Sequence, residues 1–283
     1  MNTYELLRVC RNNRTAVFTA VPFAGAALGS LIAELLPDSF AQSPFLIILH
    51  VALWSAIISA PLTLALFLAD IIYRRGRLNN PEIIKTALLA GAIAGAISGA
   101  VAQTIYNIDL GSGLFKNIIV RSLCWGIMGA ILGWRLSKRV PNLGPLRGCL
   151  AGLVGGIIGG LGFIFTSAIF PEFIGRMLGV GILGAALGVA IITIEQMFRT
   201  ASLLVRWGPK ETTTLNLGAT PITIGGGDDH VCLRGIQPKA YSVWVEQGKV
   251  FCKDHMAGKQ VEVKDKGTFT IARVDFQVSV KQL

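Results

Sequence analysis

The stretch RGCLAGLVGGIIGGLGFIFTSAIF, from Arg147 to Phe170, decides the fold class of this chain. Its only charged residue is the first one, Arg147. An uninterrupted apolar run of about 20 residues is long enough for an α-helix to cross a bilayer. The stretch is therefore predicted to be a membrane span, and the rest of the chain is best understood by working outward from it.

Apolar runs of comparable length lie on both sides of this stretch, separated by clusters of proline and glycine. Across the chain 52% of residues are hydrophobic and 15% are charged, against about 25% charged in an ordinary soluble domain. We therefore predict an all-α membrane domain of six transmembrane helices in residues 1–200. The predicted spans are Ala16–Leu36, Phe45–Tyr73, Ile83–Ile108, Leu114–Trp134, Arg147–Phe170 and Met177–Phe198.

Basic residues are distributed unevenly between the connections of these spans. Arginines precede the first span, and the second and fourth connections are basic, whereas the first connection has no Lys or Arg. Basic connections stay on the cytoplasmic side of a membrane. The alternation predicts a membrane protein with both termini in the cytoplasm. It also explains the net charge of +10 without a nucleic-acid partner.

Glycines recur at intervals of four within the predicted spans, and this spacing places them on one face of a helix. Two backbones can approach closely along such a face, which favours helix packing inside a bilayer. The pattern predicts a compact bundle, and it leaves open a pore or a homo-oligomer built on the same faces. The clearest runs are Gly91, Gly95 and Gly99 in the third span and Gly152, Gly156 and Gly160 in the fifth.

Few ionisable residues interrupt the spans, and no ladder of them crosses the middle of the membrane. Glu34 and Arg121 have a similar predicted depth near the outer ends of their spans, so we expect an intramembrane ion pair between them. Buried ionisable residues often mark ion pathways in transporters. Because these two lie at the interface, a structural pair is the preferred interpretation.

The pattern changes in residues 201–283 to short runs of β-formers separated by turn sequences. Many short alternating strands of this kind predict an antiparallel sandwich or barrel. The fold class is therefore a membrane all-α bundle followed by a C-terminal all-β domain. The predicted strands are Ser202–Trp207, Thr213–Leu217, Ile222–Gly225, Val231–Leu233, Ala240–Glu246, Lys249–Lys253, Lys259–Val263, Thr268–Ala272 and Asp275–Lys281.

The most unusual turn of this tail lies in TPITIGGGDDHVCL, from Thr220 to Leu233. A phosphate-binding P-loop needs Gly-Lys-Ser/Thr at the start of a helix, and this stretch lacks the lysine and leads into a strand. A metal ion would need Asp228, Asp229 and His230 to converge, which adjacent residues rarely do without a distant ligand. We interpret the stretch as a turn or an interaction loop, and we expect no metal and no cofactor.

The order of strands and turns in the tail resembles that of forkhead-associated (FHA) domains. The opening strands and first loop of that family are similar to LNLGATPITIGGGDDHVCL. Its central segment is similar to IQPKAYSVWVEQGKVFCKD, and its closing strands are similar to GTFTIARVDFQVSV. The resemblance covers nearly the whole tail, and the preceding glycine-rich spans resemble those of bacterial membrane proteins that carry such a tail, which implies the bacterial inner membrane. The resemblance of the tail implies a β-sandwich in which loops at one end dock phosphothreonine peptides.

The residues that contact phosphate in that family are replaced in this chain. Gly226 stands where the resemblance places the phosphate-contacting arginine, and Gln237 stands where it places a phosphate-binding serine. The structural histidine of the family falls at Ala240, and its peptide-clamping asparagine falls near Ala257. The resemblance therefore implies an FHA-like fold without the phosphate contact of the family.

Other residues of the same loops are the remaining candidates for contact with a partner. Arg234 and Lys239 are the nearby cations that could substitute for the missing arginine. Asp228 and Asp229 make the first loop acidic. An acidic loop favours a partner that is not held through a phosphate group.

No catalytic constellation is evident, because the chain has 3 histidines at distant positions and no nucleophile motif. We expect a non-enzymatic membrane anchor or scaffold that recruits a cytoplasmic protein in signalling or complex assembly. One alternative is a transporter or channel subunit with the sandwich as its regulatory domain. Another is a membrane receptor that binds phosphopeptides.

Overall fold

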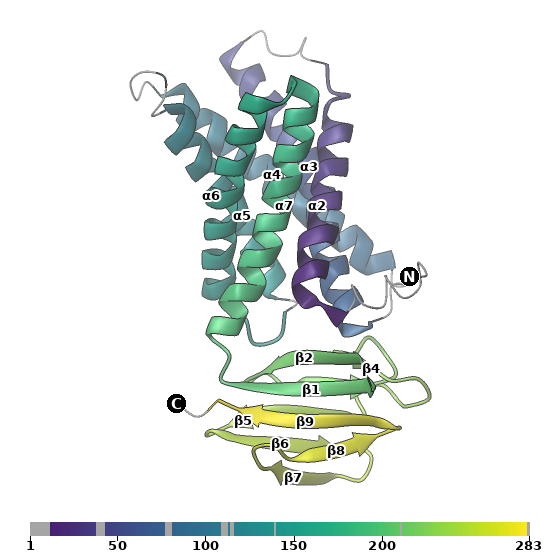
Figure 1. Ribbon diagram of the computed structural model, residues 1–283. Helices are drawn as coiled ribbons and strands as arrows, with labels where there is room; N and C mark the ends of the chain where they lie inside the picture. The colour runs from purple at the N-terminus through teal and green to yellow at the C-terminus, as the bar shows by residue number, and fades with distance from the viewer. Residues whose placement is uncertain are drawn as a thin grey trace.

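The computed structural model describes residues 12–37, 43–76, 81–108, 113, 116–138, 140–209 and 211–281. The chain forms a bundle of long helices with a β-sandwich across one end (Figure 1). Six helices are long and apolar enough to cross a membrane, which indicates a multi-pass membrane protein. They are α2 (Arg14–Ala33), α3 (Pro44–Arg74), α4 (Pro81–Asn107), α5 (Arg121–Ser137), α6 (Pro145–Ile169) and α7 (Glu172–Met197), with a π-helical turn, η2 (Lys116–Val120), before α5.

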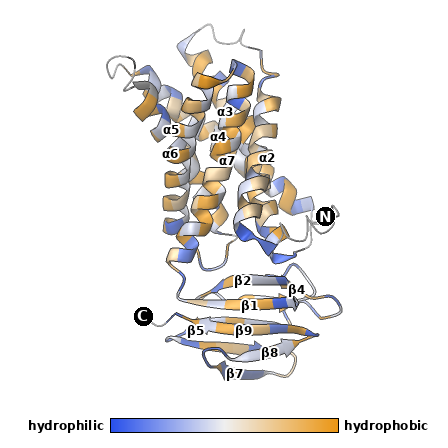
Figure 2. Cartoon of the chain, in the orientation of Figure 1, coloured by the Kyte–Doolittle hydropathy of each residue, from blue (hydrophilic) through white to orange (hydrophobic). Residues whose placement is uncertain are grey.

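The hydropathy of the chain follows this division. Along the ribbon, apolar residues predominate in the helices, and polar residues are frequent at the helix ends and in the sandwich (Figure 2). Leu88 and Leu89 of α4 are among many large apolar side chains left exposed on the bundle. Such surface is stable against lipid but costly in water. The predicted fourth span begins at Leu114, which lies outside the described residues.

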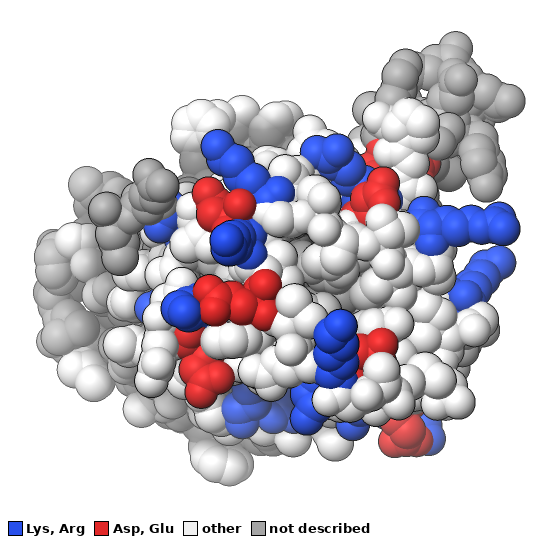
Figure 3. Space-filling view, turned by 90° about the horizontal axis from the view of Figure 1, so that it is seen from below, with Lys and Arg blue, Asp and Glu red and all other residues white. Residues whose placement is uncertain are grey.

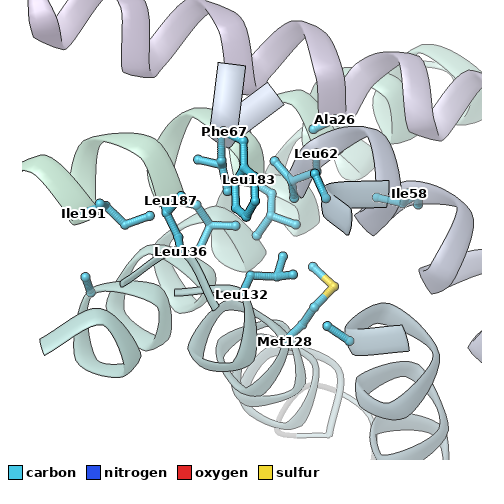
Figure 4. Close-up of a cluster of buried hydrophobic side chains, with 14 of the residues drawn as sticks. Ala26, Ile58, Leu62, Phe67, Met128, Leu132, Leu136, Leu183, Leu187 and Ile191 are labelled. Carbon is cyan, nitrogen blue, oxygen red and sulfur yellow. The ribbon is translucent and has the colours of Figure 1, made fainter. Parts of the chain in front are cut away.

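Successive helices of the bundle pack against one another, and α2 closes the arrangement by packing against α7. The contact between α4 and α5 is the least extensive of the successive pairs. Side chains from α3, α5 and α7 meet in the middle of the bundle, where Leu62, Leu132 and Leu183 are buried (Figure 4). This apolar cluster holds the central part of the bundle together.

The glycines singled out in the sequence lie at contacts between helices of this same chain. Those on α4 face α3, and those on α6 face α5. Cβ atoms added at these positions would meet backbone oxygen atoms or, at one position, the side chain of Trp125. The described bundle therefore uses these faces for its own packing. The residues are Gly91, Gly95 and Gly99 of α4 and Gly152, Gly156 and Gly160 of α6.

Only residues 198–200 separate α7 from the sandwich. One sheet has the strand order β2-β1-β9-β8, and the other has the order β4-β3-β5-β6-β7. Each predicted strand is present, with ends that differ by at most two residues. The strands are β1 (Ala201–Gly208), β2 (Glu211–Leu217), β3 (Ile222–Gly225), β4 (Val231–Cys232), β5 (Tyr241–Glu246), β6 (Lys249–Asp254), β7 (Lys259–Val263), β8 (Thr268–Ile271) and β9 (Val274–Val280).

The core of the sandwich follows from the alternation of its strands. Leu203 and Val205 of β1 and Phe276 and Val278 of β9 are fully buried, two residues apart on each strand. Alternate residues of a strand point to the same face of its sheet, so these side chains fill the space between the two sheets. The prediction of a C-terminal all-β domain is confirmed in this two-sheet form.

Candidate functional site: the loop end of the sandwich and its docked edge

The sandwich contacts the helices along one edge, formed by β2 and the turn after it. At the end of α3, the Tyr73 hydroxyl accepts a hydrogen bond from the Thr214 N–H at 2.9 Å and lies 3.4 Å from the Thr214 carbonyl oxygen. The Thr213 hydroxyl donates to the Tyr73 carbonyl oxygen at 3.3 Å. The outer side of an edge strand carries unpaired backbone groups. Tyr73 satisfies these groups at Thr214 and ties α3 to β2.

The connection between α5 and α6 contacts the same edge through Asn142. The Asn142 side-chain amide donates to the carbonyl oxygens of Asn216 at 3.1 Å and Thr220 at 3.2 Å. Its Oδ1 accepts from the Thr220 N–H at 3.0 Å. The side chain thereby supplies the donor and the acceptor that a neighbouring strand would supply. Asn142 has a φ of 60°, in the left-handed region that asparagine adopts more readily than most residues.

Buried carboxylates at this end of the bundle each pair with an arginine. The side chain of Glu195 is 1% exposed and that of Asp70 is 6% exposed. Removing one partner of a buried ion pair is strongly destabilising, because it leaves an uncompensated charge. These pairs therefore hold α2, α3, α7 and β2 in one arrangement. They are Arg14–Glu195, Arg199–Glu195, Arg74–Asp70 and Arg75–Glu211.

His230 lies in the loop between β3 and β4, close to the docked edge. Its Nδ1 accepts a hydrogen bond from the Thr223 N–H at 3.1 Å. Burial, together with the positive charge of Arg74, lowers the pKa of His230 from 6.5 to about 4, against an opposing effect of Asp229. The imidazole is therefore neutral at neutral pH and carries its proton on Nε2.

Three loops meet at one end of the sandwich, which we call the loop end. They cover residues 226–230, 233–240 and 255–258. The strand registers place them together, since Tyr241 of β5 pairs with Ile224 of β3 and with Asp254 of β6. The turn between β5 and β6 lies at the opposite end. All of the tail residues that the sequence singled out fall within the loop end.

Asp229 is part of the internal framework of the loop end. Its Oδ2 accepts hydrogen bonds from the Gly227 N–H at 3.3 Å and from the Lys239 N–H at 3.0 Å. The residue is 9% exposed. Asp229 is therefore not free to contact a partner as predicted from the sequence, because its carboxylate joins the first loop to the second.

Gly226 occupies a position that no larger residue can fill without moving the neighbouring loop. Its N–H donates to the Gln237 carbonyl oxygen at 3.1 Å. A Cβ atom built at Gly226 would run into the carbonyl oxygen of Ile236. The residue that stands where the resemblance places an arginine is thus fixed as glycine by the path of the second loop.

Other residues of the three loops present their side chains to solvent. The third loop is held by Asp254, whose carboxylate accepts from the Met256 N–H at 2.8 Å and the Ala257 N–H at 3.0 Å. Chiefly through the bond from Ala257, these contacts lower the pKa of Asp254. The loop end therefore combines an ordered backbone with a set of exposed side chains. These are Asp228, Arg234, Gln237, Lys239 and Ala257.

At the other end of the bundle, Glu34 pairs with Arg176 rather than with Arg121. The Arg176 Nη1 lies 3.3 Å from both carboxylate oxygens of Glu34. Arg121 lines the same pocket as these two residues. The ion pair expected from the sequence is replaced because α7, which carries Arg176, packs directly against α2.

Sequence reasoning missed the residues that dock the sandwich. Tyr73 ends a predicted span, and Asn142 lies in the connection between two predicted spans, so neither residue carries a sequence signal for docking. Within the described ranges, no group of three or more His, Cys, Asp and Glu side chains could hold a metal ion.

Comparisons of the chain with protein-family models, with curated proteins and with solved structures found no match.

Proposed function

We propose that this chain is a non-enzymatic anchor of the bacterial inner membrane that recruits a cytoplasmic protein through an FHA-like sandwich. Both termini and the sandwich would face the cytoplasm, where the partner acts in signalling or complex assembly. The arginines at the sandwich end, among them Arg74 and Arg75, support this orientation because basic residues stay on the cytoplasmic side.

The observation that carries the proposal is that the sandwich is held at a fixed angle to the bundle while its loop end stays exposed. Tyr73 and Asn142 hold β2 and the following turn, and the short connection from α7 holds β1. A binding surface that is already ordered loses less entropy when a partner docks. This geometry suits a module that presents one surface to a partner at the membrane.

The surface chemistry favours a protein partner over a nucleic acid. On the face of the sandwich turned away from the helices, acidic and basic side chains are interspersed (Figure 3). A nucleic-acid surface instead gathers Lys and Arg on one face or along one groove. Mixed charge with satisfied backbone groups is typical of the rim of a protein interface.

The loop end supports an FHA-like module that lacks the phosphate contact of the family. The two-sheet layout agrees with the fold that the resemblance implies. Gly226 has no room for an arginine, and a phosphate would need a fixed cationic group in its place. Arg234 and Lys239 are exposed on the second loop and are the cations that a partner would meet first.

The test is affinity purification of the full chain from membranes dissolved in a mild detergent. The wild type is compared with the double variant Arg234→Glu, Lys239→Glu, and with Lys249→Glu at the opposite end of the sandwich. We expect a specific partner to be captured by the wild type and by Lys249→Glu, and lost from the double variant. Equal capture by all three would contradict a binding role for the loop end.

Phosphatase treatment of the extract separates the two kinds of recognition. Capture that survives the treatment supports the scaffold without a phosphate contact. Loss of the partner after treatment would instead show a phosphopeptide receptor that uses Arg234 and Lys239. In a second experiment, solute flux through the purified chain in liposomes would favour a transporter or channel.

A further inference from the structure

A cavity opens between the helices at the end of the bundle far from the sandwich, and it has two connected compartments. The inner compartment has a volume of about 200 Å³ and lies between α3, α4, α5 and α6. The outer one has a volume of about 280 Å³ and lies between α2, α3, α5, α6 and α7. Together they reach the size of small-molecule sites, ~300–1,000 Å³. Val51, Trp54, Arg121 and Phe163 line both compartments.

Aromatic side chains form much of the wall where the compartments join. The rings of Trp54 and Trp125 meet edge to face at 6.3 Å, and the rings of Trp125 and Phe163 lie 5.5 Å apart. Met128 extends the same apolar lining inward. A wall of this kind favours an apolar chain over a hydrated ion, because it offers contact area with few polar partners.

The outer compartment is lined by the Glu34–Arg176 ion pair and by Arg121, the first residue of α5, which also lines the inner compartment. In the parts of the chain that the structure describes, no carboxylate forms an ion pair with Arg121, and Glu34 is already engaged by Arg176. Arg121 is exposed, so its guanidinium is open to a ligand that enters the cavity.

We propose that this cavity binds one anionic amphiphile, with its head against Arg121 and its apolar chain along Trp54, Trp125 and Phe163. A guanidinium group matches the two oxygens of a carboxylate or a phosphate with parallel hydrogen bonds. The head group can come from an anionic membrane lipid or from a free single-chain amphiphile. Both sources offer the same chemistry, and the experiment below distinguishes them.

Tryptophan fluorescence of the full chain in nanodiscs of phosphatidylcholine tests the proposal directly. Dibrominated stearate quenches tryptophan on contact, and Trp54 and Trp125 lie in the wall of the cavity. We expect saturable quenching of the wild type and a half-saturating concentration raised about tenfold or more in Arg121→Gln. Arg147→Gln, which removes a guanidinium 4.6 Å from the Phe198 ring at the other end of the bundle, should bind like the wild type.

A second variant keeps the test decisive if Arg121→Gln folds poorly. Ala102 lines the inner compartment, and Ala102→Phe should fill it and abolish saturable quenching while Arg121 is retained. The thermal unfolding of each variant is measured first, so that loss of fold is distinguished from loss of binding. Quenching that is unchanged in both folded variants, or that never saturates in the wild type, would overturn the proposal.

The source of the ligand is found by placing the bromine in the bilayer. Brominated phosphatidylglycerol is compared with brominated phosphatidylcholine at the same fraction of the nanodisc lipid. Stronger quenching by the anionic lipid that depends on Arg121 supports a site filled from the membrane. Quenching by stearate alone, with the same dependence, supports a site for a free amphiphile. Failure of both anionic probes contradicts the site and leaves the recruitment proposal untouched.

Discussion

The two ends of the helix bundle use similar residues in opposite ways. At the sandwich end, the buried carboxylates Glu195, Asp70 and Glu211 each have an arginine partner, and β2 closes over them. At the far end, aromatic residues and Arg121 surround an open cavity. Ion pairing makes the sandwich end a rigid joint, whereas Arg121 at the far end has no carboxylate partner among the described residues, which fits the ligand site proposed above.

The largest expected difference between the two ends comes from the same substitution made at each. Glu195→Gln leaves Arg14 and Arg199 without a buried counter-charge and should lower the free energy of unfolding by about 3–5 kcal/mol. The Glu34 side chain is 24% exposed, so Glu34→Gln should lower the free energy of unfolding by no more than about 1 kcal/mol. Thermal unfolding in detergent measures both, and equal losses would remove the distinction between a joint and an open end.

A smaller effect is expected from two glycines of α6. Gly152 lies in the tight part of the bundle, where an added Cβ would meet the carbonyl oxygen of Gly129. Gly152→Ala should therefore destabilise the chain by about 3 kcal/mol through overpacking. Gly162 lies nearer the far end, and an added Cβ there would meet the γ2 methyl group of Ile182 and no backbone atom, so Gly162→Ala should lower stability by less than Gly152→Ala does. The same thermal assay compares the two variants.

Acidification should loosen the contact between β3 and the loop that follows it, through His230. Since the folded pKa is about 4 and the ordinary value is 6.5, the unfolded chain binds a proton first as the pH falls. Stability should therefore decrease between pH 6.5 and pH 4, by roughly 2–3 kcal/mol. His230→Asn keeps an acceptor for the Thr223 N–H and should flatten this dependence. The measurement is the rate of amide hydrogen exchange in β3 at each pH, corrected for the intrinsic effect of pH on exchange, in the wild type and in the variant.

The smallest effect concerns one hydroxyl of the joint. Tyr73→Phe leaves the Thr214 N–H without its hydrogen-bond partner and should lower the free energy of unfolding by about 1–2 kcal/mol. Hydrogen exchange should rise in β2 before it rises in the rest of the sandwich. Thr212→Ala changes an exposed residue of the same strand and serves as the matched control. Equal protection of β2 in all three proteins would mean that Tyr73 does not fix the edge.

The elements of this fold could be predicted because their signals are local. The apolar run Arg147–Phe170 indicates a helix by its length, and the alternation in β1 and β9 indicates strands by its period. The partners of individual polar residues could not be predicted in the same way. Glu34 meets Arg176 because α7 closes against α2, and Asp229 turns inward because a second loop offers it the Lys239 N–H. Such contacts depend on packing between distant segments.

The pairing of β1 with β9 has a consequence for how the protein is made. β1 leaves the membrane directly after α7, yet it lies between β2 and β9 in its sheet, and the Lys281 N–H bonds back to the Thr200 carbonyl oxygen at 2.9 Å. During translation every helix emerges before the strand that completes this sheet. Long-range strand pairing is slow to form, so the bundle can assemble while the sandwich is still open. Docking onto Tyr73 and Asn142 would then be the final step of folding, in which a finished membrane part serves as the template for the cytoplasmic part.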